Sequence, residues 1–335
     1  MRSAVNKYIS ALSLAALTGT LLSFNASAQS ENTFAPHGSP HALIFTNVNT
    51  TFNKDGNSKA FELNRAYFGY EYFFSKKISS RITFDIADPG VGGLKMTAIL
   101  KFAYVQYKSD NFSARFGVIS TDQFTLQEKQ WGYRYISKSF QDAYNFGPSA
   151  DLGAAVEYSP AKIISLDASL LNGEGYKNIQ LDSTFKATLG ITLKPFKGFQ
   201  FRGYIDIMDN DFAQTSTSLF AGYTLKNFKT GAEYNMQKNN KMINGHDYSG
   251  ISIFASIGLA EKFSIFTRYD YLMSSIPEGS TDPWNKSKDG QYFIAGFDYS
   301  PVKGVKIAPT YIGYSPYDNS APFTSRTGLY FEIRF

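Results

Sequence analysis

Apolar and polar side chains alternate along repeated segments of about ten residues between residue 41 and the C-terminus. In the segment 183–193, every second residue from Phe185 to Leu193 is apolar, and the residues between them are polar or glycine. Successive side chains of a strand point to opposite faces, so this pattern gives one apolar and one polar face. The apolar faces of 163–172, 183–193 and 263–272 contain no charge, as contact with lipid requires. The alternation therefore predicts strands of a membrane-spanning β-barrel.

Sixteen segments carry this pattern, an even number as a single-chain bacterial barrel requires. Two of them fit less well. Lys101 falls on the same face of its strand as the apolar Val105, and Pro309 interrupts a strand in which it cannot donate a hydrogen bond. At Pro309 we expect a bulge or the outer end of the strand. We predict a sixteen-stranded antiparallel transmembrane β-barrel over 41–335, with strands at 41–52, 60–74, 78–87, 97–108, 111–120, 150–158, 163–172, 183–193, 199–208, 217–225, 228–237, 248–257, 263–272, 290–299, 305–314 and 327–335.

The connections between these segments are alternately short and long, as in outer-membrane barrels, whose short turns face the periplasm. The longest, 121–149, contains the apolar run 131–136, which is unusual for a solvent-exposed loop tip. We therefore expect this connection to have a function. The long connections are predicted at 53–59, 88–96, 121–149, 173–182, 209–216, 238–247, 273–289 and 315–326.

Residues 1–28 have the composition of an export signal. Arg2 and Lys7 accompany an uncharged apolar stretch, and Ala26-Ser27-Ala28 forms an A-x-A cleavage site. A membrane-anchoring helix is disfavoured, because the apolar run is shorter than the ~20 residues that span a bilayer. We expect a cleaved signal peptide at 1–28, a flexible segment at 29–40, and a location in the outer membrane of a Gram-negative cell.

Composition excludes several other classes of protein. The 23 Tyr and 30 Phe residues suit the two aromatic girdles of a barrel. The absence of cysteine excludes disulfides and thiolate sites. Without Arg2 and Lys7, the 33 basic residues fall to 31 against 28 acidic residues, which is too balanced for a nucleic-acid-binding protein. We therefore expect the lipid bilayer, and no nucleic acid, as a partner.

Candidate catalytic and metal-binding groups are few. His37, His41 and His246 have no catalytic motif around them, although Ser249 lies near His246 in the sequence. The loop 90–93 lacks the Lys-Ser/Thr of a phosphate-binding loop, and the acids within 206–211 lack the spacing of a calcium loop. We expect no enzyme activity, no cofactor and no metal. The alternatives are a lipase- or protease-like barrel and a non-conducting structural or adhesion barrel.

Three stretches, Phe61–Tyr67, Trp131–Arg134 and Ser149–Gly153, resemble the phosphate-selective porin O/P family. The layout is also similar to that of sixteen-stranded porins, in which the third extracellular loop folds into the lumen. The resemblance implies that 121–149 is an inserted constriction loop and that the protein is a passive pore for ions and small hydrophilic solutes. It allows a homotrimer. It does not imply phosphate selectivity, because no ladder of basic residues can be matched position by position.

The C-terminal residue carries a second resemblance. Residues 329–335 alternate between an apolar and a polar face, and the chain ends at Phe335. Known outer-membrane proteins have a last strand that ends in Phe and is read by the assembly machinery. This resemblance implies that Phe335 is the assembly signal and that the outer-membrane barrel assembly machinery is a partner.

The predicted inward face of the barrel is nearly neutral, because acidic and basic residues occur on it in similar numbers. Arg81, Arg115, Arg202 and Arg268 lie at similar heights near mid-membrane, and only Arg81 has a predicted cross-strand acid, Glu71. Guanidinium groups suit oxyanions, so we predict a weak preference for phosphate-like anions. The candidate pore-lining residues are Arg65, Arg81, Arg115, Arg202 and Arg268 from the wall and Trp131, Arg134 and Lys138 from the connection 121–149. Hairpin geometry also predicts that Glu71 lies opposite Arg81, Lys186 opposite Asp206, and Asp298 opposite Lys306.

Overall fold

The computed structural model describes residues 34–87, 95–180, 182–281, 284–317 and 322–335. The predicted signal peptide, 1–28, lies outside the described residues, and so do residues 29–33 of the predicted flexible segment. Residues Pro36–Phe335 form one compact unit. Within the described residues, no helix is long and apolar enough to cross a bilayer.

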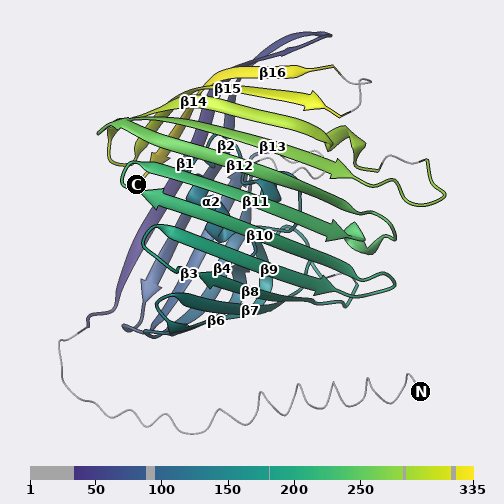
Figure 1. Ribbon diagram of the computed structural model, residues 1–335. Helices are drawn as coiled ribbons and strands as arrows, with labels where there is room; N and C mark the ends of the chain where they lie inside the picture. Colours follow the sequence, from purple (N-terminus) through teal and green to yellow (C-terminus); the bar gives the residue numbers. More distant parts are fainter. Residues whose placement is uncertain (1–33, 88–94, 181, 282–283, 318–321) are drawn as a thin grey trace. The chain divides into compact units, whose positions relative to one another are not determined.

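Sixteen antiparallel strands close into a barrel (Figure 1), in which each strand pairs with its neighbours in sequence and β1 pairs with β16. The predicted number and order of strands are confirmed, and every predicted strand end lies within four residues of the observed one. The strands are β1 (His37–Asn53), β2 (Gly56–Phe73), β3 (Ile78–Ala87), β4 (Thr97–Lys108), β5 (Phe112–Ser120), β6 (Ala150–Ala161), β7 (Ile164–Leu171), β8 (Lys186–Leu193), β9 (Phe199–Met208), β10 (Gln214–Leu225), β11 (Phe228–Lys238), β12 (Tyr248–Ala260), β13 (Phe263–Ser274), β14 (Gly290–Val302), β15 (Val305–Pro316) and β16 (Thr324–Arg334).

A β-bulge in β4 explains why Lys101 does not fit the alternation. Thr83 of β3 pairs with Phe102, and Phe84 pairs with Leu100, so Lys101 is the extra residue. The bulge reverses the phase of the strand. Lys101 consequently lies buried on the inner side, while Val105 is exposed on the outer side.

The predicted long connection 53–59 is wrong. β1 and β2 stay paired up to Asn53 and Gly56, and only Lys54 and Asp55 join them. The tip is polar on both strands, so it lacks the alternation that marks the lipid-facing part of a barrel strand. The hydrogen-bonded hairpin therefore continues beyond the segment that the pattern could detect.

The expectation for Pro309 is also wrong. β15 continues through this residue, which pairs with Leu329 of β16. The β14–β15 register is the same at Gly296↔Thr310 and at Tyr299↔Ile307, on either side of Pro309. The irregularity lies nearer the turn, between Tyr299 and Val302.

One of the three predicted opposed pairs is confirmed, since Glu71 lies opposite Arg81. Asp206 lies opposite Thr188 rather than Lys186, although the Lys186 Nζ and Asp206 Oδ2 atoms are still 3.7 Å apart. β14 continues to Val302, which pairs with Val305 across a two-residue turn, so Asp298 is not opposite Lys306. Lys306 lies opposite Glu332 of β16 instead. Both register errors therefore arise at turns, 194–198 and 303–304, whose geometry differs from the predicted one.

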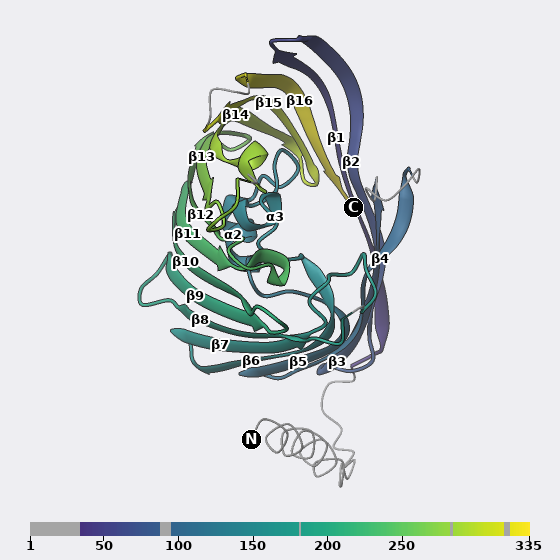
Figure 2. The ribbon, with the colours of Figure 1, turned by 90° about the vertical axis from the view of Figure 1, so that its right-hand side faces the viewer.

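The barrel is apolar outside, and its main cluster of buried aromatic residues is inside. Phe116, Leu189 and Phe297 are among the exposed apolar side chains on the outer face. The segment 121–149, called the inserted segment below, lies within the ring of strands and contains the helices α2 (Thr125–Trp131) and α3 (Phe140–Ala143) (Figure 2). Two short 3-10 helices, η1 (Asn240–Met242) and η2 (Lys286–Lys288), lie in later connections.

Candidate functional site

The two ends of the inserted segment are joined to each other and to the barrel wall. Thr121 donates its hydroxyl to the carbonyl oxygen of Pro148 at 2.6 Å. Arg115 of β5 donates to both carboxylate oxygens of Asp122, at 2.8 and 2.5 Å, and Arg202 of β9 donates to the Asp122 carbonyl oxygen at 2.9 Å. These bonds fix the point at which the segment leaves the wall.

An aromatic cluster holds the middle of the inserted segment. Trp131, which is 2% exposed, lies 5.5 Å from the Phe254 ring of β12 and 6.2 Å from the Phe266 ring of β13. Tyr133 packs on Phe266 at 4.3 Å between ring centroids. The burial of Trp131 accounts for the apolar run 131–136 that stood out in the sequence. This residue is a core residue of the lumen and has little surface to offer a solute.

A polar network holds the second half of the inserted segment. Gln141 of α3 donates to the Ser218 hydroxyl of β10 at 3.0 Å and lies 3.4 Å from the Glu233 carboxylate of β11. Gln237 donates to the Phe146 carbonyl oxygen at 2.8 Å. Sequence reasoning missed these glutamines. For Gln141, the available signal was the several glutamines within 121–149, a segment otherwise rich in aromatic residues.

Arg268 also holds the inserted segment. Its side chain is 1% exposed, forms two hydrogen bonds with Asp270 on the same strand, and donates to the carbonyl oxygen of Lys138. Its guanidinium lies 5.3 Å from the Trp131 ring. Arg268 is therefore neutralised and enclosed rather than open to the lumen.

The observed ion pairs of the four arginines in the predicted band differ from the predicted ones. Arg115, Arg202 and Arg268 form ion pairs with Asp122, Asp167 and Asp270, at 2.5 to 2.6 Å. Arg81 was predicted to be the paired one, and it does face Glu71 across the sheet. Its guanidinium instead contacts Thr83 and His41 and lies 5.0 Å from the Phe102 ring, and no ion pair of Arg81 occurs within the part of the chain that the structure describes.

A basic cluster lies between the inserted segment and the strands β2 to β4. Lys101 Nζ and Arg134 Nη2 lie 3.4 and 3.3 Å from the hydroxyl of Tyr67, so both cations contact one tyrosine. Arg134 and Lys138 share Asp142, at 2.6 and 3.1 Å. The cluster consists of Arg65, Lys101, Arg134 and Lys138.

Three acidic residues oppose this basic cluster. Asp85 pairs with Arg65 at 2.5 Å and accepts a hydrogen bond from Tyr176 at 2.6 Å. Burial by itself would raise the pKa of Asp142, but Arg134 and Lys138 outweigh it and hold this pKa at about 2. The third acid, Glu128, lies 3.4 Å from Arg134. Four cations thus face three carboxylates, and Lys138 keeps 41% of its side chain exposed.

Sequence reasoning found only part of this cluster. Arg65, Arg134 and Lys138 were predicted, whereas Lys101 was missed. Lys101 was missed because its bulge places it out of phase with the rest of its strand.

Two hollows lie toward the end of the barrel formed by the short turns. One of about 630 Å³ lies on the short-turn side of the inserted segment and is bordered by Trp131, Tyr133, Lys229 and Asp298. Another of about 560 Å³ is bordered by Lys162, Lys194 and Lys197, together with Gln130 and Phe196 among others. Polar and basic groups therefore border the space between the inserted segment and this mouth.

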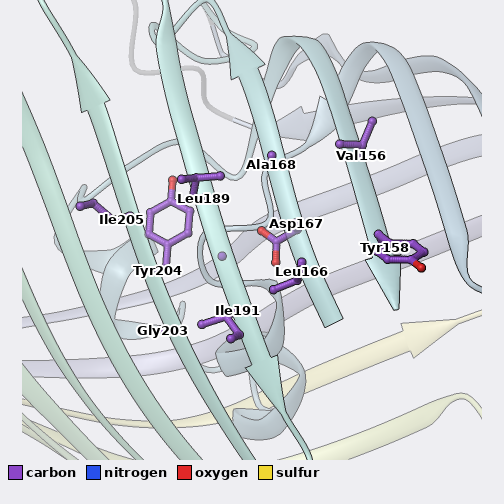
Figure 3. Close-up of a pocket in the computed structure, with 11 residues that line it drawn as sticks. Val156, Tyr158, Leu166, Asp167, Ala168, Leu189, Ile191, Gly203, Tyr204 and Ile205 are labelled. Atoms are coloured by element: carbon purple, nitrogen blue, oxygen red, sulfur yellow. The ribbon is translucent and has the colours of Figure 1, made fainter. Parts of the chain in front are cut away.

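A third hollow, of about 470 Å³, faces outward instead (Figure 3). Leu166, Leu189, Ile191 and Ile205 border it, and it lies where Gly203 leaves the outer face of β9 without a side chain. Its apolar lining matches the rest of the lipid-facing surface. This groove is not part of the candidate pore.

Phe335 lies at the closure of the barrel. Its N–H donates to the Ala42 carbonyl oxygen at 3.1 Å, and the Ala42 N–H donates to the Phe335 carbonyl oxygen at 2.8 Å. The residue is 76% exposed. The role of Phe335 as an assembly signal stays a prediction.

Comparisons with known proteins agree with this architecture. No protein-family model and no curated protein sequence matches the chain. Among solved structures, the chain is similar to OmpF of Salmonella typhi in complex with daunomycin, with 12% identity over 89% of this chain and 97% of that chain and a TM-score of 0.67. The anion-selective porin from Comamonas acidovorans gives 8% identity, 90% and 100% coverage, and a TM-score of 0.65. OmpT of Vibrio cholerae, described as an outer membrane protein in trimer form, gives 14% identity, 90% and 100% coverage, and a TM-score of 0.60. The chain has the fold of outer-membrane porins.

Proposed function

We propose that this protein is an outer-membrane porin through which ions and small hydrophilic solutes diffuse passively. The apolar outer wall and the polar inner wall suit a bilayer outside and water inside. Water within the lumen lowers the dielectric barrier that a bilayer presents to a charged solute. In this proposal the inserted segment is a constriction, which limits the size of the solutes that pass.

The basic cluster is the observation that supports a weak preference for anions. It combines four cations with three carboxylates, whereas Arg115, Arg202 and Arg268 each have an acidic partner nearby. A narrow passage with low-dielectric walls concentrates the field of the charges that line it. Forked guanidinium donors favour oxyanions, so we expect the preference to be strongest for phosphate-like solutes.

Single-channel recording in planar bilayers tests both parts of this proposal. We expect steady conductance, with a reversal potential in a salt gradient that shows a weak anion preference. The double variant Lys101→Gln with Lys138→Gln removes two cations of the cluster and should shift the reversal potential toward cations. The control, Lys54→Gln with Lys59→Gln, removes the same charge from the exposed β1–β2 tip and should change the potential little.

The outcomes separate the two parts. A clearly cation-selective wild type would contradict the anion preference and leave the porin proposal intact. A folded barrel that conducts nothing would contradict the porin proposal and favour a structural or adhesion role.

We also propose that the protein is not an enzyme. His41 contacts Thr83 and Arg81, and His246 stacks on Trp284 at 4.4 Å between ring centroids, so neither is arranged as the base of a serine nucleophile. No group of three or more His, Asp or Glu side chains that could hold a metal occurs among the described residues. Hydrolysis of lipid or peptide by purified, folded protein would contradict this proposal.

Assembly as a homotrimer in the outer membrane completes the proposal. The support is the similarity to OmpT, which is described in a trimer form. Light scattering of the protein in detergent, together with fractionation of the cell envelope, tests the oligomeric state and the location. A monomer at all concentrations would contradict the trimer without affecting the channel.

A further inference from the structure

Lysines occur at every short turn of the barrel. The seven short connections are 74–77, 109–111, 162–163, 194–198, 226–227, 261–262 and 303–304. Each contains at least one lysine or directly follows one, and the turns contain only two acidic residues, Asp110 and Glu261. All nine lysines have exposed side chains. This lysine ring consists of Lys76, Lys77, Lys108, Lys162, Lys194, Lys197, Lys226, Lys262 and Lys303.

The opposite end of the barrel has a different charge. The connections 172–185, 209–213 and 239–247 contain five acidic residues and two lysines. Because the antiparallel strands pair in sequence order, consecutive connections lie at alternate ends of the barrel (Figure 1). These three connections therefore lie at the end away from the short turns. They show no excess of lysine.

Lipid-facing residues place part of the lysine ring at a membrane surface. Phe74 and Ile78 are exposed on either side of Lys76 and Lys77, and Tyr107 and Phe112 are exposed on either side of Lys108. Val302, next to Lys303, is exposed as well. Aromatic and apolar side chains at the edge of the apolar band lie at the boundary with the headgroups. A lysine one or two residues further along reaches headgroup level.

We propose that the lysine ring binds the phosphate groups of anionic phospholipids in the leaflet that the short turns face. The charges are complementary, and the flexible lysine stem allows each ammonium to follow a mobile headgroup. Lys262 donates to the Pro301 carbonyl oxygen at 3.0 Å, and no ion pair of the nine lysines occurs among the residues that the structure describes. Such contacts fix the height and tilt of the barrel and gather anionic lipid around one end, whatever passes through the lumen.

Four of the nine lysines have a second environment. Lys162, Lys194 and Lys197 border the hollow of about 560 Å³, and Lys226 borders the hollow of about 630 Å³. These residues can also act on solutes at the mouth of the proposed pore. The test therefore uses Lys76, Lys77, Lys108 and Lys303, which border neither hollow.

The experiment compares the association of spin-labelled phosphatidylglycerol and phosphatidylcholine with the full barrel in phosphatidylcholine vesicles, by electron paramagnetic resonance. A lysine near an anionic surface contributes about 1 kcal/mol, which corresponds to about a fivefold change in a binding constant. We expect wild type to prefer the anionic lipid by up to about this factor, less so in high salt. The variant Lys76→Gln, Lys77→Gln, Lys108→Gln, Lys303→Gln should lose most of the preference.

The matched control removes four lysines from the opposite end: Lys54→Gln, Lys59→Gln, Lys241→Gln and Lys288→Gln. It should keep the wild-type preference. Equal association of both lipids with wild type, or the same loss in the control as in the test variant, would overturn the proposal. Folding is checked by the heat-modifiable mobility of each barrel. Because lipid association needs no conductance, this result is independent of the proposed porin function.

Discussion

At Gly190, the inner face of β8 has no side chain, and an ion pair occupies the space. Asp167 of β7 and Arg202 of β9 meet across β8, at 2.6 Å. A Cβ atom at residue 190 would lie 2.4 Å from Asp167 Oδ1 and 2.5 Å from Arg202 Nη2. The glycine is therefore what permits two strands that are not neighbours to share a salt bridge.

The variant Gly190→Ala should force this ion pair apart. Overpacking and loss of optimal pairing of buried charges should lower the free energy of unfolding by about 1–3 kcal/mol. Urea-induced unfolding in vesicles measures the difference. Gly203→Ala is the matched control, because its Cβ would point outward and meet Ile191 Cγ2 only at 3.5 Å. Equal effects of the two variants would argue against the role of Gly190.

Individual side chains were predictable in orientation and not in pairing. The alternation placed Arg115, Arg202 and Arg268 on the inner face, as observed. Their partners could not be derived in the same way. Asp122 belongs to a connection, and Asp167 lies two strands from Arg202, so neither is the directly opposed residue of a hairpin.

At the scale of elements, the inserted segment combines local and long-range causes. Its apolar run 131–136 indicated an interior position, because such a run is costly to expose to water. Its docking site depends on contacts between residues far apart in sequence, such as Gln130 with Thr224 and Gln141 with Ser218. These contacts follow from the closed barrel, which brings β10 to β13 around the segment, and not from any local pattern.

The variant Trp131→Ala should loosen the inserted segment without unfolding the barrel. Truncation of a buried aromatic residue costs about 3–5 kcal/mol, and here that cost falls on one docked segment. We expect faster tryptic cleavage within 121–149, which contains Lys129, Arg134 and Lys138, and larger or noisier conductance steps. Phe297→Ala, at a lipid-facing aromatic residue, should leave both readouts unchanged. Unchanged cleavage in Trp131→Ala would show that the polar network alone holds the segment.

At the scale of the whole molecule, the sixteen strands were predictable because the alternation is local and repeats in every strand. The two faces of each strand can be predicted from its own residues, so a wrong assignment in one strand does not affect the next. There are two exceptions. At the polar tip of β1–β2, contact with lipid does not govern the sequence. At Lys101, a bulge interrupts the alternation. The closed order follows from pairing each strand with the next.

Deleting Phe335 should reduce assembly far more than stability. The deletion removes two terminal hydrogen bonds with Ala42, which contribute only about 1 kcal/mol each. We expect nearly normal refolding in detergent but a sharp loss of heat-modifiable barrel in the outer membrane. Phe335→Tyr, which keeps an aromatic end, is the control. Wild-type levels of folded protein in cells without Phe335 would contradict the assembly-signal prediction.

The pairing of β1 with β16 makes completion of the chain a condition for folding. Leu43 and Arg334 are partners in this pairing although they lie at opposite ends of the barrel sequence. Until the last strand is in place, the sheet keeps two open edges, and open edges can pair with strands of other chains. A chain without its last strand is therefore prone to aggregation, whereas the closed ring has no free edge.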